Sequence, residues 1–264
     1  MSEEKEGKNL TLYILDRSLL AKGKEIAERL AISYIVGELP LDSKGKVKLE
    51  KEELVLVLSE DGLSLTDGIN TMRGDFSEKL SRLKPNNLNG EMLVKATKIK
   101  GASFPMTLID ATAGMGEDSL ILAAAGFEVK LFEYNSVIAE LLKDTLERAK
   151  KVPELSAIVA RMEYIGGDSI EAMNNLTFTP DIILLDPMFP ERQKSSLVKK
   201  KFQLLQKLEQ PCSDERAMME AALKVNPRRI VIKRMLKNPY LGDIKPDYSI
   251  EGKAIRYDCI VQKS

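Results

Sequence analysis

The stretch Asp181-Ile-Ile-Leu-Leu-Asp186-Pro-Met-Phe-Pro190 runs an apolar strand into a carboxylate, two prolines and an aromatic ring. The apolar and β-branched residues after Asp181 are typical of a buried parallel strand. The prolines that follow can neither extend a ladder of hydrogen bonds nor start a helix at once. Asp186 and Phe189 are therefore expected at the carboxyl edge of a sheet, where open α/β sheets bind their ligands.

Strands and helices alternate along the chain from residue 106 onward. Strands are predicted at 106–109, 128–132, 162–165, 181–185 and 229–232, and helices at 117–125, 136–150, 195–208 and 214–223. Regular alternation of this kind favours a doubly wound, mostly parallel sheet. Two further strands at 248–251 and 254–261 fit an antiparallel addition at the edge of that sheet.

The amino-terminal part has a different pattern, in which short strands and turns surround a helix. Strands are predicted at 9–15, 47–49, 54–58 and 63–65, and a helix from a Ser18 cap to about residue 32. Residues 84–90 read as a turn-rich loop, and residues 91–99 have helical spacing. The chain is therefore expected to consist of a small α+β lobe over residues 1–75 and an α/β domain over residues 76–264.

Composition and charge limit the classes of function. The chain has 264 residues, of which 44% are hydrophobic and 30% charged, and no apolar run approaches the roughly 18 residues of a membrane span. The first residues are polar and lack the apolar core of a secretory signal, so a cytoplasmic location is expected. The 40 basic residues balance 40 acidic ones, so a polyanionic partner needs a local basic patch.

Catalysis by imidazole is excluded because the sequence contains no histidine. This absence removes the Ser-His and Cys-His nucleophiles and every histidine metal site. The two cysteines, Cys212 and Cys259, are far apart and lack metal-ligand spacing, which favours free thiols over a disulfide or a zinc site. Neither a metal nor a membrane partner is expected.

The first strand of the α/β region ends in Asp110-Ala-Thr-Ala-Gly114-Met-Gly116-Glu-Asp118, directly before a helix. Glycine at such a junction lets the backbone approach a ligand, and the amides of the helix offer donors to a carboxylate or phosphate. The pattern is weak by itself, because tight strand-to-helix turns also need glycine for steric reasons. Ser119 stands where the dinucleotide fingerprint has its third glycine, which argues against NAD.

Two further strands also end in polar residues. Glu133 lies about 20 residues beyond the glycine turn, where a carboxylate can accept hydrogen bonds from ribose hydroxyls. Asp168 and Ser169 follow two glycines at the end of the next strand. Each has a simpler interpretation, a solvated strand end for Glu133 and an Asx or Ser turn for the other two. Together with Asp186, however, they indicate one crevice, because the carboxyl ends of parallel strands share an edge.

This order of strand ends resembles the S-adenosylmethionine-dependent methyltransferases that act on exocyclic amino groups. Those enzymes carry an (Asp/Asn)-Pro-Pro-(aromatic) tetrad where this chain has Asp186-Pro-Met-Phe189, so Met188 replaces the second proline. The stretches 110–118, 185–200 and 230–234 resemble the RsmJ family of bacterial small-subunit (16S) rRNA guanine-N2 methyltransferases. The similarity covers roughly residues 90–235 and is looser in the amino-terminal lobe.

The resemblance implies a Rossmann-like class I methyltransferase sheet, with S-adenosylmethionine as the cofactor. Cofactor contacts would fall on the glycine turn and the strand ends, at Gly114, Glu117, Asp118, Glu133, Tyr134, Asp168, Ser169 and Asp186. In this interpretation Glu133 takes the ribose diol, and Asp168 with Ser169 the adenine edge. Acidic walls also suit the cationic sulfonium.

The resemblance further implies methyl transfer to the N2 amino group of a guanosine in 16S rRNA of the small ribosomal subunit. This amino group is a poor nucleophile but carries protons, so Asp186 and the carbonyl of Pro187 can orient it. Phe189 can stack on the extracted base, since base-modifying enzymes require a flipped or single-stranded nucleotide. Such a transfer needs no covalent intermediate, in agreement with a chain that lacks histidine.

A run of basic residues follows the tetrad and includes Arg192, Lys194, Lys199 and Lys200. Its place beside the expected chemistry favours phosphate binding, although a charge run is more often a solvated helix face. Two other functions are left open. One is methyl transfer to an amino group of adenine or cytosine in DNA or another RNA, or to a protein amide. The other is a Rossmann-like domain that has lost catalysis and binds RNA or another partner.

Overall fold

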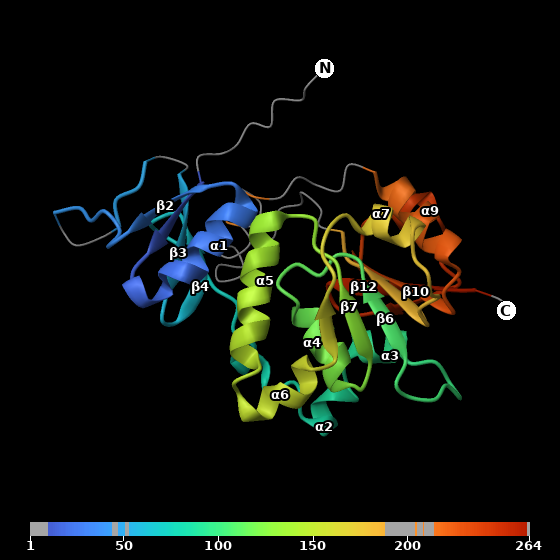
Figure 1. Ribbon diagram of the computed structural model, residues 1–264. Coiled ribbons are helices and arrows are strands. Elements are labelled where there is room, and N and C mark those ends of the chain that lie inside the picture. The colour runs from blue at the N-terminus through green and yellow to red at the C-terminus, as the bar shows by residue number, and fades with distance from the viewer. Residues whose placement is uncertain are drawn as a thin grey trace, which may run out of the picture. The chain divides into compact units, whose positions relative to one another are not determined.

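The structure is a computed structural model and describes residues 10–43, 47–50, 53–187, 204, 208 and 214–262. Its contacts divide the chain into two compact units, with a boundary after Gly74. The first unit contains a five-stranded sheet and the second a seven-stranded sheet (Figure 1). Within the described ranges, no helix combines the length and the apolar character needed to cross a membrane.

The first unit is built on a mixed sheet. Its elements are β1 (Leu10–Ile14), α1 (Leu20–Leu30), β2 (Ser33–Val36), β3 (Leu54–Ser59), β4 (Gly62–Thr66) and β5 (Thr71–Met72). The strand order is β2-β1-β3-β4-β5, in which β1 pairs in parallel with β2 and β3, and the last three strands are antiparallel. Leu12, Ile14 and Leu56 are completely buried, as the apolar patterns of these strands predict.

Local details of this unit differ from the sequence expectations. Ser18 is not the helix cap, because Asp16 accepts a hydrogen bond from the Ser18 amide at 2.7 Å and caps a 3-10 turn, η1 (Arg17–Leu19), before α1. Strand β2 was not expected, since its side chains are all exposed and only its pairing with β1 defines it. Within residues 47–50, Val47 forms an isolated bridge to Leu41 instead of a strand.

The second unit contains the predicted α/β sheet. Its strands are β6 (Thr107–Asp110), β7 (Glu128–Leu131), β8 (Met162–Tyr164), β9 (Ile182–Leu185), β10 (Arg229–Met235), β11 (Tyr248–Glu251) and β12 (Ile255–Val261). They lie in the order β11-β12-β10-β9-β6-β7-β8. β6 to β10 are parallel, and β12 is antiparallel to both β10 and β11, which confirms a Rossmann-like sheet with an antiparallel edge. The strand order switches between β6 and β9, where doubly wound sheets bind ligands.

Helices cover both faces of this sheet (Figure 1). One face carries α3 (Met92–Thr97), α4 (Glu117–Ala124), α5 (Ser136–Ala149) and α6 (Pro153–Val159), and the other carries α7 (Ser169–Asn174) and α9 (Glu215–Val225). Alternate strand residues enter opposite cores: Leu108 and Leu184 pack on the first set, Ile109 and Ile183 on the second. All four are completely buried, as expected for parallel strands between two helical layers.

Short helices account for most of the differences from expectation in this unit. α2 (Pro85–Leu88) lies within the predicted loop 84–90, where Pro85 takes the first helical position. α6 and α7 have seven and six residues, too few to produce a clear helical period in the sequence. The predicted basic helix at 195–208 lies outside the described residues except for Leu204 and Leu208.

Candidate active site at the carboxyl edge of the sheet

The glycine turn after β6 is packed at one glycine and open at the other. Gly114 and Gly116 have positive φ angles of 52° and 75°. A Cβ atom at Gly116 would lie 2.7 Å from Leu142, so packing alone explains that glycine. At Gly114 no atom of the described residues would lie within 4 Å of such a Cβ atom. Gly114 is therefore the position at which a ligand can approach the main chain.

Glu133 holds this turn from the end of the neighbouring strand β7. Its Oε2 accepts a hydrogen bond from the Gly114 amide at 2.8 Å, and its Oε1 accepts one from the Asn135 amide at 2.7 Å. Glu133 is 9% exposed, so it is not a solvated strand end. Burial raises the pKa of its carboxyl group, and the backbone donors partly oppose this rise. Each oxygen retains a second acceptor site, which suits the two hydroxyls of a ribose.

Asp168 and Ser169 lie at the start of α7. Asp168 caps the helix, because its Oδ1 accepts hydrogen bonds from the amides of Ile170 at 2.7 Å and Glu171 at 3.4 Å. This is the Asx-type arrangement that its position after two glycines also allowed. Ser169 is buried in the first turn of the helix. Capping uses one carboxylate oxygen of Asp168, so contact with an adenine edge stays a prediction.

Two further predicted site residues are at the surface, and five lie outside the described residues. Glu117 begins α4 and makes an ion pair with Lys79 of η2 (Phe76–Lys79) at 2.7 Å. Tyr134 is 80% exposed. Five predicted residues lie outside the described part of the chain: Phe189, Arg192, Lys194, Lys199 and Lys200. The roles predicted for all of these residues stay predictions.

Asp186 follows β9 at the switch point, between the ends of β6 and β10. Its backbone amide donates a hydrogen bond to Oγ1 of Thr112 at 2.7 Å, which ties the end of β9 to the turn after β6. Pro187 is buried directly after it. Burial raises the pKa of the Asp186 carboxyl group, and the ammonium of Lys233 acts against that rise.

Lys233 of β10 joins two of the predicted site residues, although the sequence analysis did not assign it to the site. Its Nζ lies 2.8 Å from Oδ2 of Asp186 and 2.6 Å from Oδ2 of Asp118. Desolvation lowers the pKa of Lys233, but the two carboxylates outweigh this effect and raise it above its ordinary value. A lysine within the apolar run Ile230-Val-Ile-Lys233 was the available signal, because a desolvated ammonium requires an acidic partner.

Asp110 at the end of β6 is a second buried carboxyl group of this edge. Its Oδ2 accepts a hydrogen bond from Oγ of Ser119 at 2.5 Å, and its Oδ1 accepts one from the Thr112 amide at 3.1 Å. Burial raises its pKa to about 7 against these hydrogen bonds, and nearby Asp118 and Asp186 add to the rise. Ser119, which interrupts the dinucleotide fingerprint, thus helps to satisfy a buried acid.

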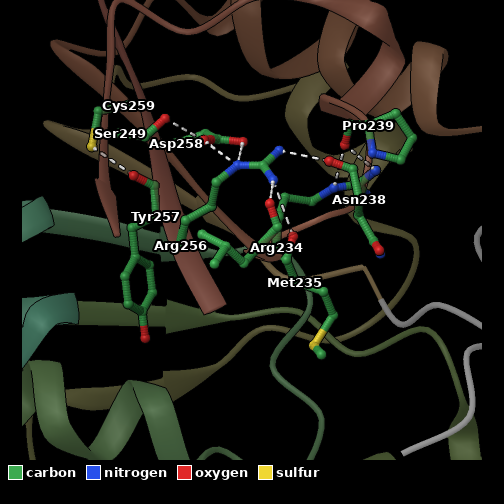
Figure 2. Close-up of polar contacts among 10 residues, drawn as sticks. Arg234, Met235, Asn238, Pro239, Ser249, Arg256, Tyr257, Asp258 and Cys259 are labelled. Carbon is green, nitrogen blue, oxygen red and sulfur yellow. Dashed lines mark hydrogen bonds and ion pairs between the residues drawn. The ribbon is translucent and has the colours of Figure 1, made fainter. Parts of the chain in front are cut away.

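Two arginines hold the loop that follows β10 (Figure 2). Arg256 of β12 pairs with Asp258 at 2.8 Å, and Arg234 donates to the carbonyl of Pro239 at 2.8 Å. The guanidinium of Arg256 also donates at 2.7 to 3.0 Å to three carbonyls at the end of β10 and in this loop, those of Met235, Leu236 and Asn238. Both arginines are buried: Arg234 is 2% exposed and Arg256 is 5% exposed. The strand end next to Lys233 is therefore firmly anchored.

The described residues fit a cationic cofactor that carries a ribose. Gly114 offers open backbone, and Glu133 beside it has acceptor sites for hydroxyls. Asp118 and Asp186 present two carboxylates against the single ammonium of Lys233, which leaves a net negative wall for a cation. S-adenosylmethionine has these chemical features, and Gly114, Glu133 and Asp118 are the residues that would hold it.

Comparison with known proteins points to the same cofactor. A family of SAM-dependent methyltransferases matches residues 41–262. Ribosomal RNA small subunit methyltransferase J of Pseudomonas aeruginosa is 40% identical, over 81% of this chain and 85% of that protein. Its namesake in Pseudomonas fluorescens is 35% identical, over 100% of this chain and 99% of that protein.

The fold also matches a solved methyltransferase. The crystal structure of a SAM-dependent methyltransferase from Neisseria gonorrhoeae superposes with a TM-score of 0.70 and 25% identity, and the match covers 96% of both chains. The matched residues include the glycine turn, Glu133, Asp168 and the Asp186 turn. The chain belongs to the S-adenosylmethionine-dependent methyltransferases, in the family of ribosomal RNA small subunit methyltransferase J.

Proposed function

We propose that this chain transfers a methyl group from S-adenosylmethionine to the exocyclic N2 amino group of a guanosine in 16S rRNA of the small ribosomal subunit. The observation that carries the proposal is the placement of Asp186, an acceptor at the switch point with its backbone held by Thr112 and its side chain by Lys233. The name shared by the relatives supports ribosomal RNA as the substrate. Such a substrate also supports action in the cytoplasm.

Asp186 has the chemistry needed to orient an amino group. Its Oδ2 is bonded to Lys233, so we assign Oδ1 to accept a hydrogen bond from the N2 amino group of the target. Bound S-adenosylmethionine supplies an electrophilic methyl group on a cationic sulfonium. Asp186 holds an N–H of the target, which limits its rotation and places the nitrogen for attack. The amino group must lose a proton when it is methylated, and in the proposal Oδ1 of Asp186 accepts that proton.

Burial of Asp186 supports this second role. The raised pKa brings its carboxylate closer to the basicity required of a proton acceptor near neutral pH. In the proposal, the carbonyl of Pro187 is a further acceptor for the amino group and Phe189 stacks on the base. The basic residues that include Arg192 and Lys194 contact phosphates on either side of the target.

The test uses Asp186→Asn in the full chain. Loss of the carboxylate is expected to lower kcat by about 100-fold or more, because one preorganised polar group at a reacting centre contributes on that order. Affinity for S-adenosylmethionine, measured by calorimetry, should fall by a smaller factor, because Gly114, Glu133 and Asp118 remain to hold the cofactor. Methyl transfer is measured on naked 16S rRNA, on small subunits and on DNA, and the methylated nucleoside is identified by mass spectrometry.

Asp181→Asn is the matched control, because Asp181 lies at the opposite end of β9 and pairs with Arg228 at 3.0 Å. It should retain turnover. N2-methylguanosine in 16S rRNA is the expected product. Methylated adenine or cytosine would replace the guanine assignment by the broader amino-methyltransferase function, and wild-type turnover in Asp186→Asn would refute the role of that residue.

A further inference from the structure

Lys233 is an exception in the strand that carries it. β10 lies inside the sheet, and Ile230, Val231 and Ile232 before the lysine are at most 1% exposed. The parallel register pairs Ile232 with Leu185, so the next step along the two strands brings Lys233 beside Asp186. Packing alone favours an apolar residue at this position. A lysine here is stabilised only by acidic partners, because a desolvated ammonium is otherwise costly.

We propose that Lys233 is a positioning residue that fixes both the orientation and the ionised state of Asp186 for methyl transfer. Lys233 reaches Oδ2 of Asp186 at 2.8 Å and is itself held by Asp118 at 2.6 Å. Rotation of the Asp186 carboxylate would break a charge-assisted hydrogen bond, so Oδ1 keeps one direction. The inference rests on the proposed function only where it assumes that Asp186 meets the target amino group.

The partial burial of this triad strengthens its ion pairs. The side chains of Lys233, Asp118 and Asp186 are 24%, 23% and 36% exposed, so water screens them much less than it screens a surface pair. The three residues also come from separate elements, α4, the end of β9 and β10. Lys233 therefore connects the predicted cofactor side of the site, at Asp118, with the predicted target side, at Asp186.

Charged groups around Asp186 act in both directions on its ionisation. Lys233 and Arg234 favour the ionised carboxylate, whereas Asp118 favours the protonated form. Among these groups Lys233 has the largest effect. Two further titratable groups, Asp110 and Tyr257, interact electrostatically with Asp186. Burial is the main cause of the raised pKa of each. Removal of Lys233 thus leaves two carboxylates facing each other, which should raise the pKa of Asp186 further.

The test compares Lys233→Met with Lys233→Arg in the full chain. Methionine removes the charge but keeps an unbranched side chain, and kcat is expected to fall about 100-fold through loss of alignment, with little change in the KM for RNA. The acid limb of the pH–rate profile should move up by about one pH unit or more. Arginine keeps the charge and can donate to both carboxylates, so it should hold the acid limb near the wild-type pH and restore part of kcat.

Asp118→Asn is expected to shift the acid limb of the pH–rate profile in the opposite direction. It removes the acid that favours protonation of Asp186, so at saturating cofactor the acid limb should move to lower pH. Lys130→Met is the matched control. Lys130 lies on β7 of the same sheet, is 29% exposed and pairs with Glu163 at 2.5 Å, and its loss should leave both the acid limb and kcat unchanged.

A second measurement does not depend on RNA. A ¹³C NMR titration of the Asp186 carboxyl group, assigned with Asp186→Asn, is expected to give a higher pKa in Lys233→Met than in the wild type. An unchanged pKa, or wild-type kcat in Lys233→Met, overturns the inference. If the wild type methylates no RNA but the pKa rises as expected, the proposed function fails and the effect of Lys233 on Asp186 is supported.

Loss of the folded state would not remove the test. If Lys233→Met does not fold, the double variant Lys233→Met/Asp118→Asn removes opposite charges together and relieves the uncompensated acid. The double variant is then expected to show the same loss of turnover. Lys233→Arg is expected to bind the cofactor product S-adenosylhomocysteine normally. Turnover near that of Asp118→Asn alone would contradict the inference.

Discussion

At the scale of single residues, the edge of the sheet contains carboxyl groups that tolerate burial in different ways. Asp110 is bonded to the hydroxyl of Ser119, and burial raises its pKa to about 7. Asp186 has Lys233 as a cationic partner, which acts against the same effect of burial. Asp110 can take up a proton near neutral pH, whereas the charge of Asp186 is balanced by an ion pair. Surroundings, not residue type, therefore set the chemistry of each carboxyl group.

The two glycines of the turn should respond differently to alanine. Gly114→Ala meets open space and carries only the cost of a positive φ angle, about 1–2 kcal/mol, but its methyl group occupies the space in which we expect the cofactor. Gly116→Ala carries a similar backbone cost and also a clash with Leu142, which adds about 1–3 kcal/mol. Urea unfolding and calorimetry with S-adenosylmethionine measure the two effects.

We expect Gly114→Ala to lose cofactor affinity while it remains largely folded, and Gly116→Ala to lose more stability. Each variant is the control for the other, because both glycines lie in one turn with positive φ. Equal affinity of Gly114→Ala and the wild type would show that the cofactor does not approach this backbone.

At the scale of elements, two adjacent residues of β10 have different roles, one in the site and one in anchoring the strand end. Because side chains alternate along a strand, Lys233 and Arg234 point to opposite faces of the sheet. Lys233 reaches the carboxylates of the site, and Arg234 lies opposite Arg256 in the antiparallel register with β12. Asp258 and the loop carbonyls compensate these two guanidinium groups (Figure 2). The strand end that supports the site is thus fixed from the opposite face.

Arg256→Met should destabilise the fold strongly. It leaves the Asp258 carboxylate, 1% exposed, without its cation and takes one donor from each of three carbonyls at the end of β10 and in the loop after it, which typically costs about 3–5 kcal/mol. Urea unfolding gives the free energy of unfolding. Arg216→Met is the control, since its pair with Glu220 is 80% exposed on the arginine side and should contribute within about 0.5 kcal/mol. A cost below about 1 kcal/mol for Arg256→Met would contradict the anchoring role.

At the scale of the whole molecule, the described residues that are assigned to the site all lie in the second unit. The glycine turn, Glu133, Asp186 and Lys233 belong to residues 75–190 and 210–264. We propose that residues 1–75 and 76–264 are separate folding units. The division of contacts after Gly74 and the two separate sheets support this proposal.

Calorimetry with and without S-adenosylmethionine tests this proposal on the full chain. Two thermal transitions are expected, and saturating cofactor should raise the midpoint of only one of them. At a ligand concentration of 100 times Kd, binding stabilises the unit that contains the site by about 2.7 kcal/mol. One cooperative transition, or equal shifts of two, would contradict separate folding.

Much of the second sheet could be predicted from the sequence, because its buried strands are continuous apolar runs that are recognisable without knowledge of their neighbours. Ile183 and Leu184 belong to a continuous apolar run, and both faces of their strand are covered by helices. β2 and α2 could not be predicted. The first is defined by backbone pairing with β1, and the second is only four residues long. Short elements depend on their surroundings more than on propensity.

Apolar runs, glycines and prolines act locally, so the class of the fold, the acids at the strand ends and the Asp186 turn could all be predicted from the sequence. The tertiary structure alone decided which groups meet. Lys233 is distant from both Asp118 and Asp186 in the sequence, and the strand order β10-β9-β6 with its register brings its ammonium to 2.6 and 2.8 Å from their carboxylates. Register and strand order arise from packing across the whole sheet, so no local pattern encodes that contact.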